Sequence, residues 1–324
     1  MSGRRAATGL AADAVGVLAG FLLDRAVGDP RRWHPVAGFG RAAGALERAV
    51  YADDRAAGAR FAAVAVGVPV VAAGVAAYVT RRRPVARAAL VAATTWAVLG
   101  GESLRREADL MADALESRDL VAARRRLPHL CGRDPAGLDT GALARATVES
   151  VAENTSDAVV GPLVWGAVAG LPGLVGYRAV NTLDAMVGHR GPRYGRFGTA
   201  SARADDAANL VPSRVTAALT VAAAPAVAGS PTNAARTWWR DGHRHPSPNS
   251  GQCEAAAAGA LGVRLGGRNV YAGRVEERPT LGDGRPPAVA DIRRAARLSG
   301  LVGAGAAGLA VATLLTRAVL RWRR

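Results

Sequence analysis

Hydrophobic and polar residues alternate in long blocks along the 324-residue chain. Three uncharged blocks, residues 61–80, 158–177 and 298–316, approach the roughly 20 residues that cross the core of a bilayer. A shorter block, residues 88–101, follows the arginine and proline turn at residues 81–84 and is expected to pair with residues 61–80 as a helical hairpin. This pattern predicts several membrane-spanning helices.

Other blocks fit a spanning helix less well. Residues 6–23 contain Asp13, and residues 215–235 are interrupted by Pro225, Gly229 and Pro231. The block at residues 158–177 holds several prolines and glycines that would break a simple helix, and non-helical backbone at membrane depth survives only inside protein or beside a polar cavity. For every block, a buried helix of a soluble core is the alternative interpretation.

The expected fold is therefore an all-α, polytopic integral membrane protein. We expect about four to five membrane-associated helices, long polar cytoplasmic loops and a single domain spanning residues 1–324. Arginine-rich loops at residues 24–60, 102–157 and 230–297 favour an inside location, whereas the arginines at 81–83 would then face outward. One of these topological assignments is strained.

Composition narrows the possible functions. The 42 basic residues are all arginine, so a Walker A loop and lysine-based covalent chemistry are excluded. The formal charge of +16 is spread over every polar segment without a nucleic-acid module, so nucleic acid is not expected as a partner. Cys131 and Cys253 lie far apart and form no CxxC pair, so a disulfide framework and a cysteine-rich metal site are not indicated.

The most informative polar segment begins at Glu149. In a helix, Glu149, Glu153 and Asp157 fall on one face because they are four residues apart, and like charges at that spacing repel. Such a stripe is solvated, matched by arginine, or bridged by a cation such as Mg²⁺, which prefers oxygen ligands. All three interpretations stay open from the residues alone.

Two similar clusters follow downstream. Asn181 and Asp184 are one helical turn apart, and Asp205, Asp206 and Asn209 lie on adjacent turns. Three carboxylate and amide clusters within 61 residues, from Glu149 to Asn209, indicate a functional site beside the membrane rather than an accident of composition.

Two further polar motifs flank these clusters. In residues 28–41, Asp29 and His34 each precede proline, which predicts turns that direct them toward a polar pocket; a surface loop is the alternative and is favoured for His34 taken alone. In residues 243–267, Asn249 or Ser250 can cap a helix that begins near Gln252, and the amides at its start can bind an anion.

Five motifs occur in an order that resembles the CobD/CbiB family of cobalamin biosynthesis: GDPRRWHPV, SVAENTSDAVVGPL, YRAVNTLDAMVGHR, FGTASARADDAANLVPSR and HPSPNSGQCEAAAAGALGVRLGG. Tyr271 and the Leu281 and Gly282 pair follow them. The resemblance runs from about residue 22 to about residue 284. An alanine-rich composition and Cys253 are atypical but leave the charged positions unchanged.

The resemblance implies an adenosylcobinamide-phosphate synthase, an amide-forming ligase of the cell (inner) membrane with a cytoplasmic active site. Such an enzyme joins (R)-1-amino-2-propanol or its O-phosphate to the free propionate of adenosylcobyric acid. Because amide formation is uphill in water, ATP and Mg²⁺ are implied, with phosphoryl transfer to the propionate before the amine attacks. The implied partners are the corrinoid, aminopropanol or its phosphate, membrane lipid and other corrinoid-assembly enzymes of the membrane.

The polar clusters can then be given roles. Mg²⁺ and triphosphate are assigned to Glu149, Glu153, Asp157 and Asp184. Proton removal from the amine is assigned to Asp205 or Asp206, with His34 as an alternative base. Substrate and phosphate binding are assigned to Asp29, Asn154, Asn181, Arg190, Arg203, Arg214, Asn249 and Gly251.

Two other functions stay open. The pairing of Asn181 and Asp184 with the segment Asp205 to Asn209 also resembles the Asp-rich, Mg²⁺-binding motifs of membrane prenyltransferases that act on a lipid diphosphate. A non-catalytic membrane sensor or transport component is the third possibility, because a shared architecture does not guarantee a shared activity.

Overall fold

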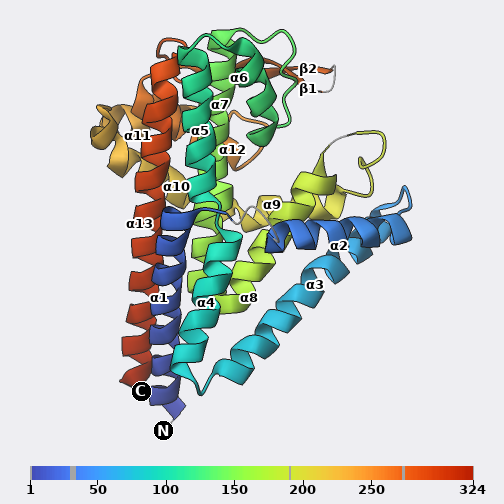
Figure 1. Ribbon diagram of the computed structural model, residues 1–324, viewed down its shortest axis with the longest axis vertical. Coiled ribbons are helices and arrows are strands. Elements are labelled where there is room, and N and C mark those ends of the chain that lie inside the picture. Colours follow the sequence, from blue (N-terminus) through green and yellow to red (C-terminus); the bar gives the residue numbers. More distant parts are fainter. Residues whose placement is uncertain (1, 30–33, 190, 272–273, 324) are drawn as a thin grey trace. The chain divides into compact units, whose positions relative to one another are not determined.

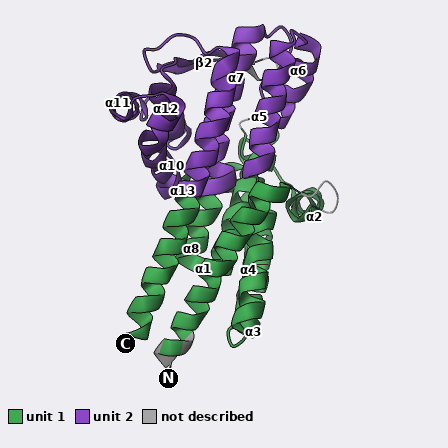
Figure 2. Cartoon of the chain, turned by 60° about the vertical axis from the view of Figure 1, so that its left-hand side comes forward, with its two compact units in different colours: residues 1–100, 161–209, 306–324 green, residues 101–160, 210–305 purple. Residues whose placement is uncertain are grey.

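The computed structural model describes residues 2–29, 34–189, 191–271 and 274–323, which are mostly α-helical (Figure 1). The chain divides into two compact units (Figure 2). Unit 1 comprises residues 1–100, 161–209 and 306–324, and unit 2 comprises residues 101–160 and 210–305. Each unit therefore joins segments that are distant in the sequence.

Unit 1 contains most of the long apolar helices. Its elements are α1 (Ser2–Val27), α2 (Pro35–Val50), α3 (Arg55–Thr80), α4 (Pro84–Val98), α8 (Gly161–Leu183), the π-helix η3 (Asp184–Gly188), α9 (Thr199–Ala208) and the end of α13 (Val289–Trp322). Figure 1 shows α2 lying across the direction of α1, α3 and α4.

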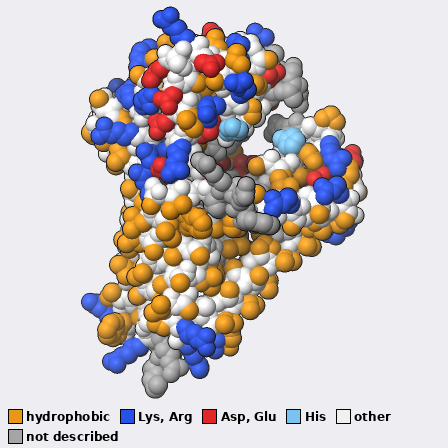
Figure 3. All heavy atoms as spheres, viewed as in Figure 1, with side chains coloured by type: hydrophobic (Ala, Val, Ile, Leu, Met, Phe, Trp, Pro, Cys, Tyr) orange, Lys and Arg blue, Asp and Glu red, His pale blue; other side chains and the backbone are white. Residues whose placement is uncertain are grey.

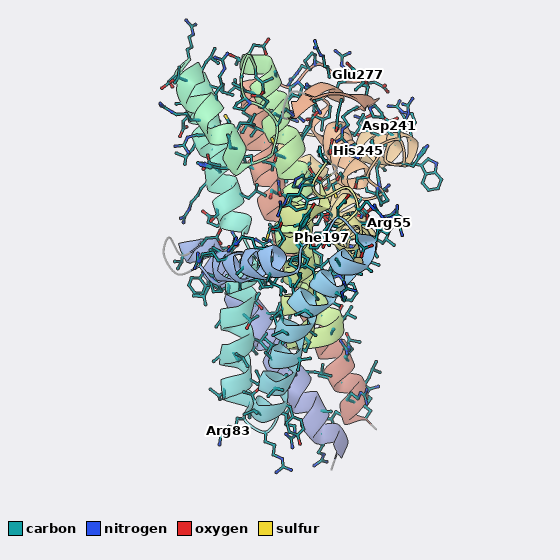
Figure 4. The ribbon with its side chains drawn as sticks, turned by 90° about the vertical axis from the view of Figure 1, so that its right-hand side faces the viewer. Arg55, Arg83, Phe197, Asp241, His245 and Glu277 are labelled. Atoms are coloured by element: carbon teal, nitrogen blue, oxygen red, sulfur yellow. The ribbon has the colours of Figure 1, made fainter. Side chains whose placement is uncertain are left out.

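Helix α3 has the features of a lipid-facing span. Val64, Val68, Val71 and Val75 lie on one face, and each is 49% to 66% exposed. The 26 residues of α3 span about 39 Å, more than the roughly 30 Å hydrocarbon core. Arginines lie at both ends of this span, as Arg55 and Arg83 show in Figure 4. On the face drawn in Figure 3, hydrophobic side chains predominate over the long helices of unit 1.

Helix α1 packs closely against α4 because two glycines face it. A Cβ atom at Gly16 would lie 2.6 Å from the Val91 Cβ, and one at Gly20 would lie 2.5 Å from the Ala92 carbonyl oxygen. Small residues at such contacts let membrane helices approach closely. The Arg87 Nε of α4 also donates to Asp13 Oδ1 at 2.6 Å. This arginine balances the charge of buried Asp13, the residue that made residues 6–23 fit a spanning helix less well.

The break expected within residues 158–177 is present. The chain passes from a π-helix, η2 (Ser156–Val160), into α8, where Gly170 has φ 64° and Pro172 follows two residues later. A positive φ suits glycine, which has no Cβ. Leu183 at the end of α8 and Val187 in η3 join Phe61 and Phe197 in the buried core of unit 1.

Unit 2 holds the polar segments. Its elements are α5 (Gly101–Glu116), α6 (Leu120–Arg126), the 3₁₀-helix η1 (Leu127–His129), α7 (Thr140–Thr155), η2, α10 (Leu210–Ala223), the 3₁₀-helix η4 (Ala224–Val227), α11 (Pro231–Asp241), α12 (Ser250–Leu261), β1 (Leu265–Tyr271), β2 (Arg274–Leu281) and the first part of α13. Residues expected to form long loops are thus largely helical, and β1 and β2 form an antiparallel hairpin that the sequence did not predict.

Buried Asp241 ties α11 to the end of this hairpin. Its Oδ2 accepts a hydrogen bond from the Gly282 amide at 2.9 Å, and Arg240 and Arg244 contact its carboxylate. The Arg240 hydrogen bonds lower the pKa of Asp241 to about 2, so this carboxylate stays charged at neutral pH. Figure 4 shows Asp241 and His245 within unit 2, with Glu277 on the hairpin.

Among the residues described, six helical stretches are long and apolar enough to cross a membrane: Ala6–Val27, Arg55–Thr80, Pro84–Glu116, Thr140–Gly188, Leu210–Val227 and Val289–Trp322. The all-α, polytopic membrane fold is confirmed. The number exceeds the expected four to five because the stretches holding Asp13 and Pro225 also qualify. Whether the chain is a single domain stays a prediction.

Candidate functional site

Four acidic side chains of unit 2 gather where α7 and η2 meet α12. We call Glu149, Glu153, Asp157 and Glu254 the carboxylate cluster. The charges of Glu149 and Glu153 act on Glu254, and those of Glu153 and Asp157 act on the neighbouring Cys253 thiol. The helical spacing read from the sequence therefore places three carboxylates against one further helix.

Glu149 is matched by arginine. Its Oε2 accepts a hydrogen bond from Arg133 Nη2 at 2.6 Å, and both side chains are buried. Its Oε1 accepts from the Gly266 amide at 2.7 Å and lies 3.8 Å from Arg145 Nη1. Of the three interpretations of the acidic stripe, the arginine-matched one applies to Glu149.

The Gly266 amide reaches Glu149 because the hairpin bulges there. The register of β1 against β2 shifts between Leu265 and Gly267, and Gly266 has φ 85°. A Cβ at Gly266 would lie 2.1 Å from the Pro279 carbonyl oxygen, so only glycine fits. Bulges of this kind redirect backbone groups beside functional sites.

Glu153 differs from Glu149 because no arginine pairs with it among the described residues. Its Oε1 accepts a 2.6 Å hydrogen bond from the Ser250 hydroxyl at the start of α12. The neighbouring Asn154 is turned to the protein interior, where its amide donates to the Ser150 carbonyl at 2.9 Å and to Leu130. The Glu153 carboxylate is therefore available to a cationic ligand, whereas the Asn154 side chain binds backbone carbonyl groups of its own unit.

Glu254 and His245 complete this polar region. Burial raises the pKa of Glu254 well above its ordinary value, and the charges of Glu149 and Glu153 act in the same direction. Burial and the adjacent Arg278 lower the pKa of His245 to about 4. His245 is thus uncharged at neutral pH, the charged form of Glu254 is disfavoured, and their side chains approach to 3.9 Å.

The start of α12 is capped differently from the sequence expectation. The side chains of Asn249 and Ser250 do not cap it; instead the Ser247 hydroxyl accepts from both of their amides. The Asn249 Oδ1 accepts from Ser213 and Arg214, so this arginine braces the turn. A Cβ at Gly251 would lie 2.5 Å from the Gly242 carbonyl oxygen, so Gly251 permits close packing there.

Unit 1 carries a second cluster, the aspartate and asparagine cluster: Asn181, Asp184, Asp205, Asp206 and Asn209. Asn181 donates to Asp205 Oδ1 at 3.2 Å and Asn209 donates to Oδ2 at 3.1 Å. The Tyr177 hydroxyl in turn donates to Asn209 Oδ1 at 2.7 Å. The two motifs read from the sequence therefore meet, as both the ligase and the prenyltransferase hypotheses expect.

Asp205 is the electrostatically unusual member of this cluster. Burial and the charge of Asp184 raise its pKa to about 7, although the Asn181 and Asn209 hydrogen bonds act in the opposite direction. A carboxylate that titrates near neutral pH can take up and release a proton during catalysis. The geometry is therefore compatible with the base role predicted for Asp205.

The remaining predicted residues lie as follows. The His34 Nδ1 accepts from the Val36 amide and caps α2, and its Nε2 lies 3.6 Å from Asp29 Oδ1. Arg203 is exposed on α9 and makes no hydrogen bond or ion pair with any described residue. Arg190 lies outside the described residues.

The four residues predicted to hold Mg²⁺ divide between the units. Glu149, Glu153 and Asp157 belong to unit 2, whereas Asp184 belongs to unit 1. Within the described part of the chain, no group of three or more histidine, cysteine, aspartate or glutamate side chains has an arrangement that could hold a metal ion. A magnesium site made of these four side chains stays a prediction.

Several site residues were missed by sequence reasoning. Glu254 lies inside the motif at residues 243–267 and next to Cys253, so the sequence could have indicated it as a site residue. Tyr177 likewise opens the motif YRAVNTLDAMVGHR, although its partner Asn209 lies 32 residues away. Arg133 and Arg278 carried no such signal, because they lie outside the quoted motifs and their partners are distant in the sequence.

Comparison with known proteins adds a separate finding. Residues 17–299 match the family model described as CobD/Cbib protein. The chain is 57% identical over 307 residues to "Cobalamin biosynthesis protein CobD" of Mycobacterium tuberculosis, covering 94% of this chain and 96% of that protein. It is 46% identical over 277 residues to the protein of the same name from Geobacter metallireducens, covering 84% and 87%.

No solved structure matches the chain. The family model covers most of the sequence, and the relatives align over nearly their full length. The chain therefore belongs to the CobD/Cbib protein family.

Proposed function

We propose that this chain acts in cobalamin biosynthesis as an adenosylcobinamide-phosphate synthase. It would join (R)-1-amino-2-propanol or its O-phosphate to the propionate of adenosylcobyric acid at the cytoplasmic side of the inner membrane. The observation that supports this proposal best is Glu153, a half-buried carboxylate that no arginine neutralises among the described residues. Family membership supports the pathway, and the two polar clusters support catalysis.

The carboxylate cluster would bind a cationic ligand of the reaction. The Ser250 hydroxyl holds Glu153 at 2.6 Å and leaves its second oxygen, Oε2, for a ligand. Glu149 is already balanced by Arg133, so it fixes the position of α7 instead of binding a ligand. Glu254, whose charged form is disfavoured by burial, and uncharged His245 add hydrogen-bonding groups beside Glu153.

Mg²⁺ fits the residues only in part. Mg²⁺ is commonly held by one or two carboxylates together with phosphate oxygens and water, rather than by a cage of protein side chains. Glu153, with Asp157 nearby, meets that requirement; Glu149 does not, because Arg133 occupies it. When bound with ATP, the ion would balance the negative charge of the phosphates.

Asp205 would act as the base that accepts a proton from the attacking amine. Asn181 and Asn209 hold its two oxygens, so the carboxylate has a fixed direction. Its pKa of about 7 lets it accept a proton near neutral pH. Arg203, exposed on the same helix, is proposed to contact phosphate.

The proposal is tested by direct assay. Detergent-purified protein is incubated with adenosylcobyric acid, ATP, Mg²⁺ and either aminopropanol or its O-phosphate, and the products are examined by mass spectrometry. We expect an ATP-dependent amide product, and the better amine identifies the substrate. If correctly folded protein yields no product with either amine, the prenyltransferase or the sensor hypothesis is favoured instead.

The pH profile tests the role of Asp205. A base works in its deprotonated form, so wild-type kcat/KM should rise about tenfold per pH unit below the pKa and level off above pH about 7. Asp205→Asn should lose this contribution, so the ratio of wild-type to variant rates should follow the titration. Exposed Asp53→Asn is the matched control. A constant ratio from pH 5 to pH 9 would rule out Asp205 as the base.

A further inference from the structure

Helix α2 borders a groove that the proposed reaction does not use. The groove lies within unit 1 and has a volume of about 830 Å³. It is lined by His34, Val36, Ala37, Gly40, Arg41, Gly44, Arg48, Thr182 and Met186. Its walls therefore come from α2 on one side and from α8 and η3 on the other.

Two glycines keep the groove open. Gly40 and Gly44 are one helical turn apart on α2 and face Met186. A Cβ at Gly40 would lie 3.9 Å from the Met186 Sδ, and one at Gly44 would lie 3.8 Å from its Cε. Both distances are ordinary van der Waals contacts, so alanine would fit at either position. Close backbone packing therefore does not require these glycines, and their lack of a side chain leaves the groove open between α2 and Met186.

The edge of the groove formed by α2 carries positive charge that no lining residue balances. Arg41 and Arg48 are exposed, lie two helical turns apart, and make no hydrogen bond or ion pair with any described residue. None of the nine lining residues is acidic. Glu47, the acidic residue of α2, accepts hydrogen bonds from Arg193 and Tyr194 at 3.0 and 2.9 Å, so it does not neutralise the groove.

The position of α2 indicates which anion is available. The helix connects the end of α1 to the start of α3 and lies across both (Figure 1). It packs Ala43, Phe39 and Leu46 against the core around Phe61. An amphipathic helix at the ends of membrane-spanning helices lies at the depth of lipid headgroups.

We propose that this groove binds an anionic phospholipid, with Arg41 and Arg48 on its phosphate and the apolar part near Val36 and Met186 along the start of an acyl chain. Guanidinium groups match phosphate oxygens, and arginines beside a membrane attract anionic lipids. The groove combines an unpaired cationic edge with an apolar floor, which suits a phosphate joined to a hydrocarbon chain better than a free phosphate. This inference does not depend on the proposed reaction.

The test measures lipid binding directly. Full-length protein is reconstituted in phosphatidylcholine nanodiscs, and binding of spin-labelled phosphatidylglycerol is titrated. Arg41→Gln/Arg48→Gln should weaken binding about 25-fold, from about fivefold per arginine. Gly44→Leu, which fills the groove without changing its charge, should weaken binding at least about tenfold, since it displaces the buried part of the chain.

Arg82→Gln/Arg83→Gln, which removes two exposed arginines at the turn between α3 and α4, is the matched control and should bind like wild type. Equal weakening in this control would mean that general surface charge attracts the lipid, and unchanged binding in Gly44→Leu would exclude the groove. ATP is added as a competitor, and displacement of the lipid by ATP would assign the groove to a soluble phosphate compound. Thermal unfolding is measured for each variant, and lipid binding is compared only among variants that unfold at the same temperature as wild type.

Discussion

Glu153→Gln is expected to reduce formation of the amide product by on the order of 10²- to 10³-fold, the usual effect of removing one charged group that stabilises a reacting centre. The substitution removes the negative charge of a side chain that no arginine balances among the described residues. Glutamine still presents an oxygen to the Ser250 hydroxyl, so the fold around α12 should survive. Turnover with adenosylcobyric acid, ATP and each amine measures the effect.

Glu277→Gln is the matched control for Glu153→Gln. Glu277 is also a glutamate of unit 2, but it is exposed on β2, so its substitution should leave turnover unchanged. Thermal unfolding in detergent shows whether both variants are folded. A Glu153→Gln protein that is folded and retains a third or more of wild-type turnover would remove the carboxylate cluster from the mechanism.

Arg133→Met is expected to destabilise unit 2 by about 3 to 5 kcal/mol, because it leaves the buried carboxylate of Glu149 without its principal partner. The cost comes from an unpaired buried charge, not from the loss of a strong attraction. Arg145, at 3.8 Å, recovers part of it. Unfolding by chemical denaturant in detergent, followed by circular dichroism, measures the difference from wild type.

Two comparisons make this prediction specific. Arg133→Met/Glu149→Gln removes both charges and should regain most of the lost stability. Arg126→Met breaks the partly exposed pair with Glu107 and should cost about 1 kcal/mol or less. If Arg126→Met and Arg133→Met cost the same, the buried pair has no special role in holding α7.

Most of the fold could be predicted because membrane spans are local features of a sequence. The uncharged run of α3 is evident without any tertiary information, and its lipid-facing valines recur on one helical face. The first span was uncertain because Asp13 stood inside it. Its partner, Arg87, lies 74 residues away, so only the packing of α1 against α4 shows that the charge is balanced.

The candidate site was predictable where its residues lie close together in the sequence. Glu149 and Glu153 were found because one helix positions both, and Asn181 was paired with Asp205 because the two motifs together resemble the Asp-rich motifs of membrane prenyltransferases. The sequence did not show which carboxylates are neutralised. That depends on Arg133 for Glu149 and on Ser250 for Glu153, which come from other segments.

The sequence by itself determined the membrane class, the helical architecture, the family and the polar motifs, because hydrophobic runs and ordered motifs are properties of neighbouring residues. Tertiary structure decided the state of each charged group. It pairs Glu149, leaves Glu153 without an arginine among the described residues, and raises the pKa of Asp205 to about 7. The physical reason is that burial and ion pairing depend on residues that are distant along the chain and meet only after folding.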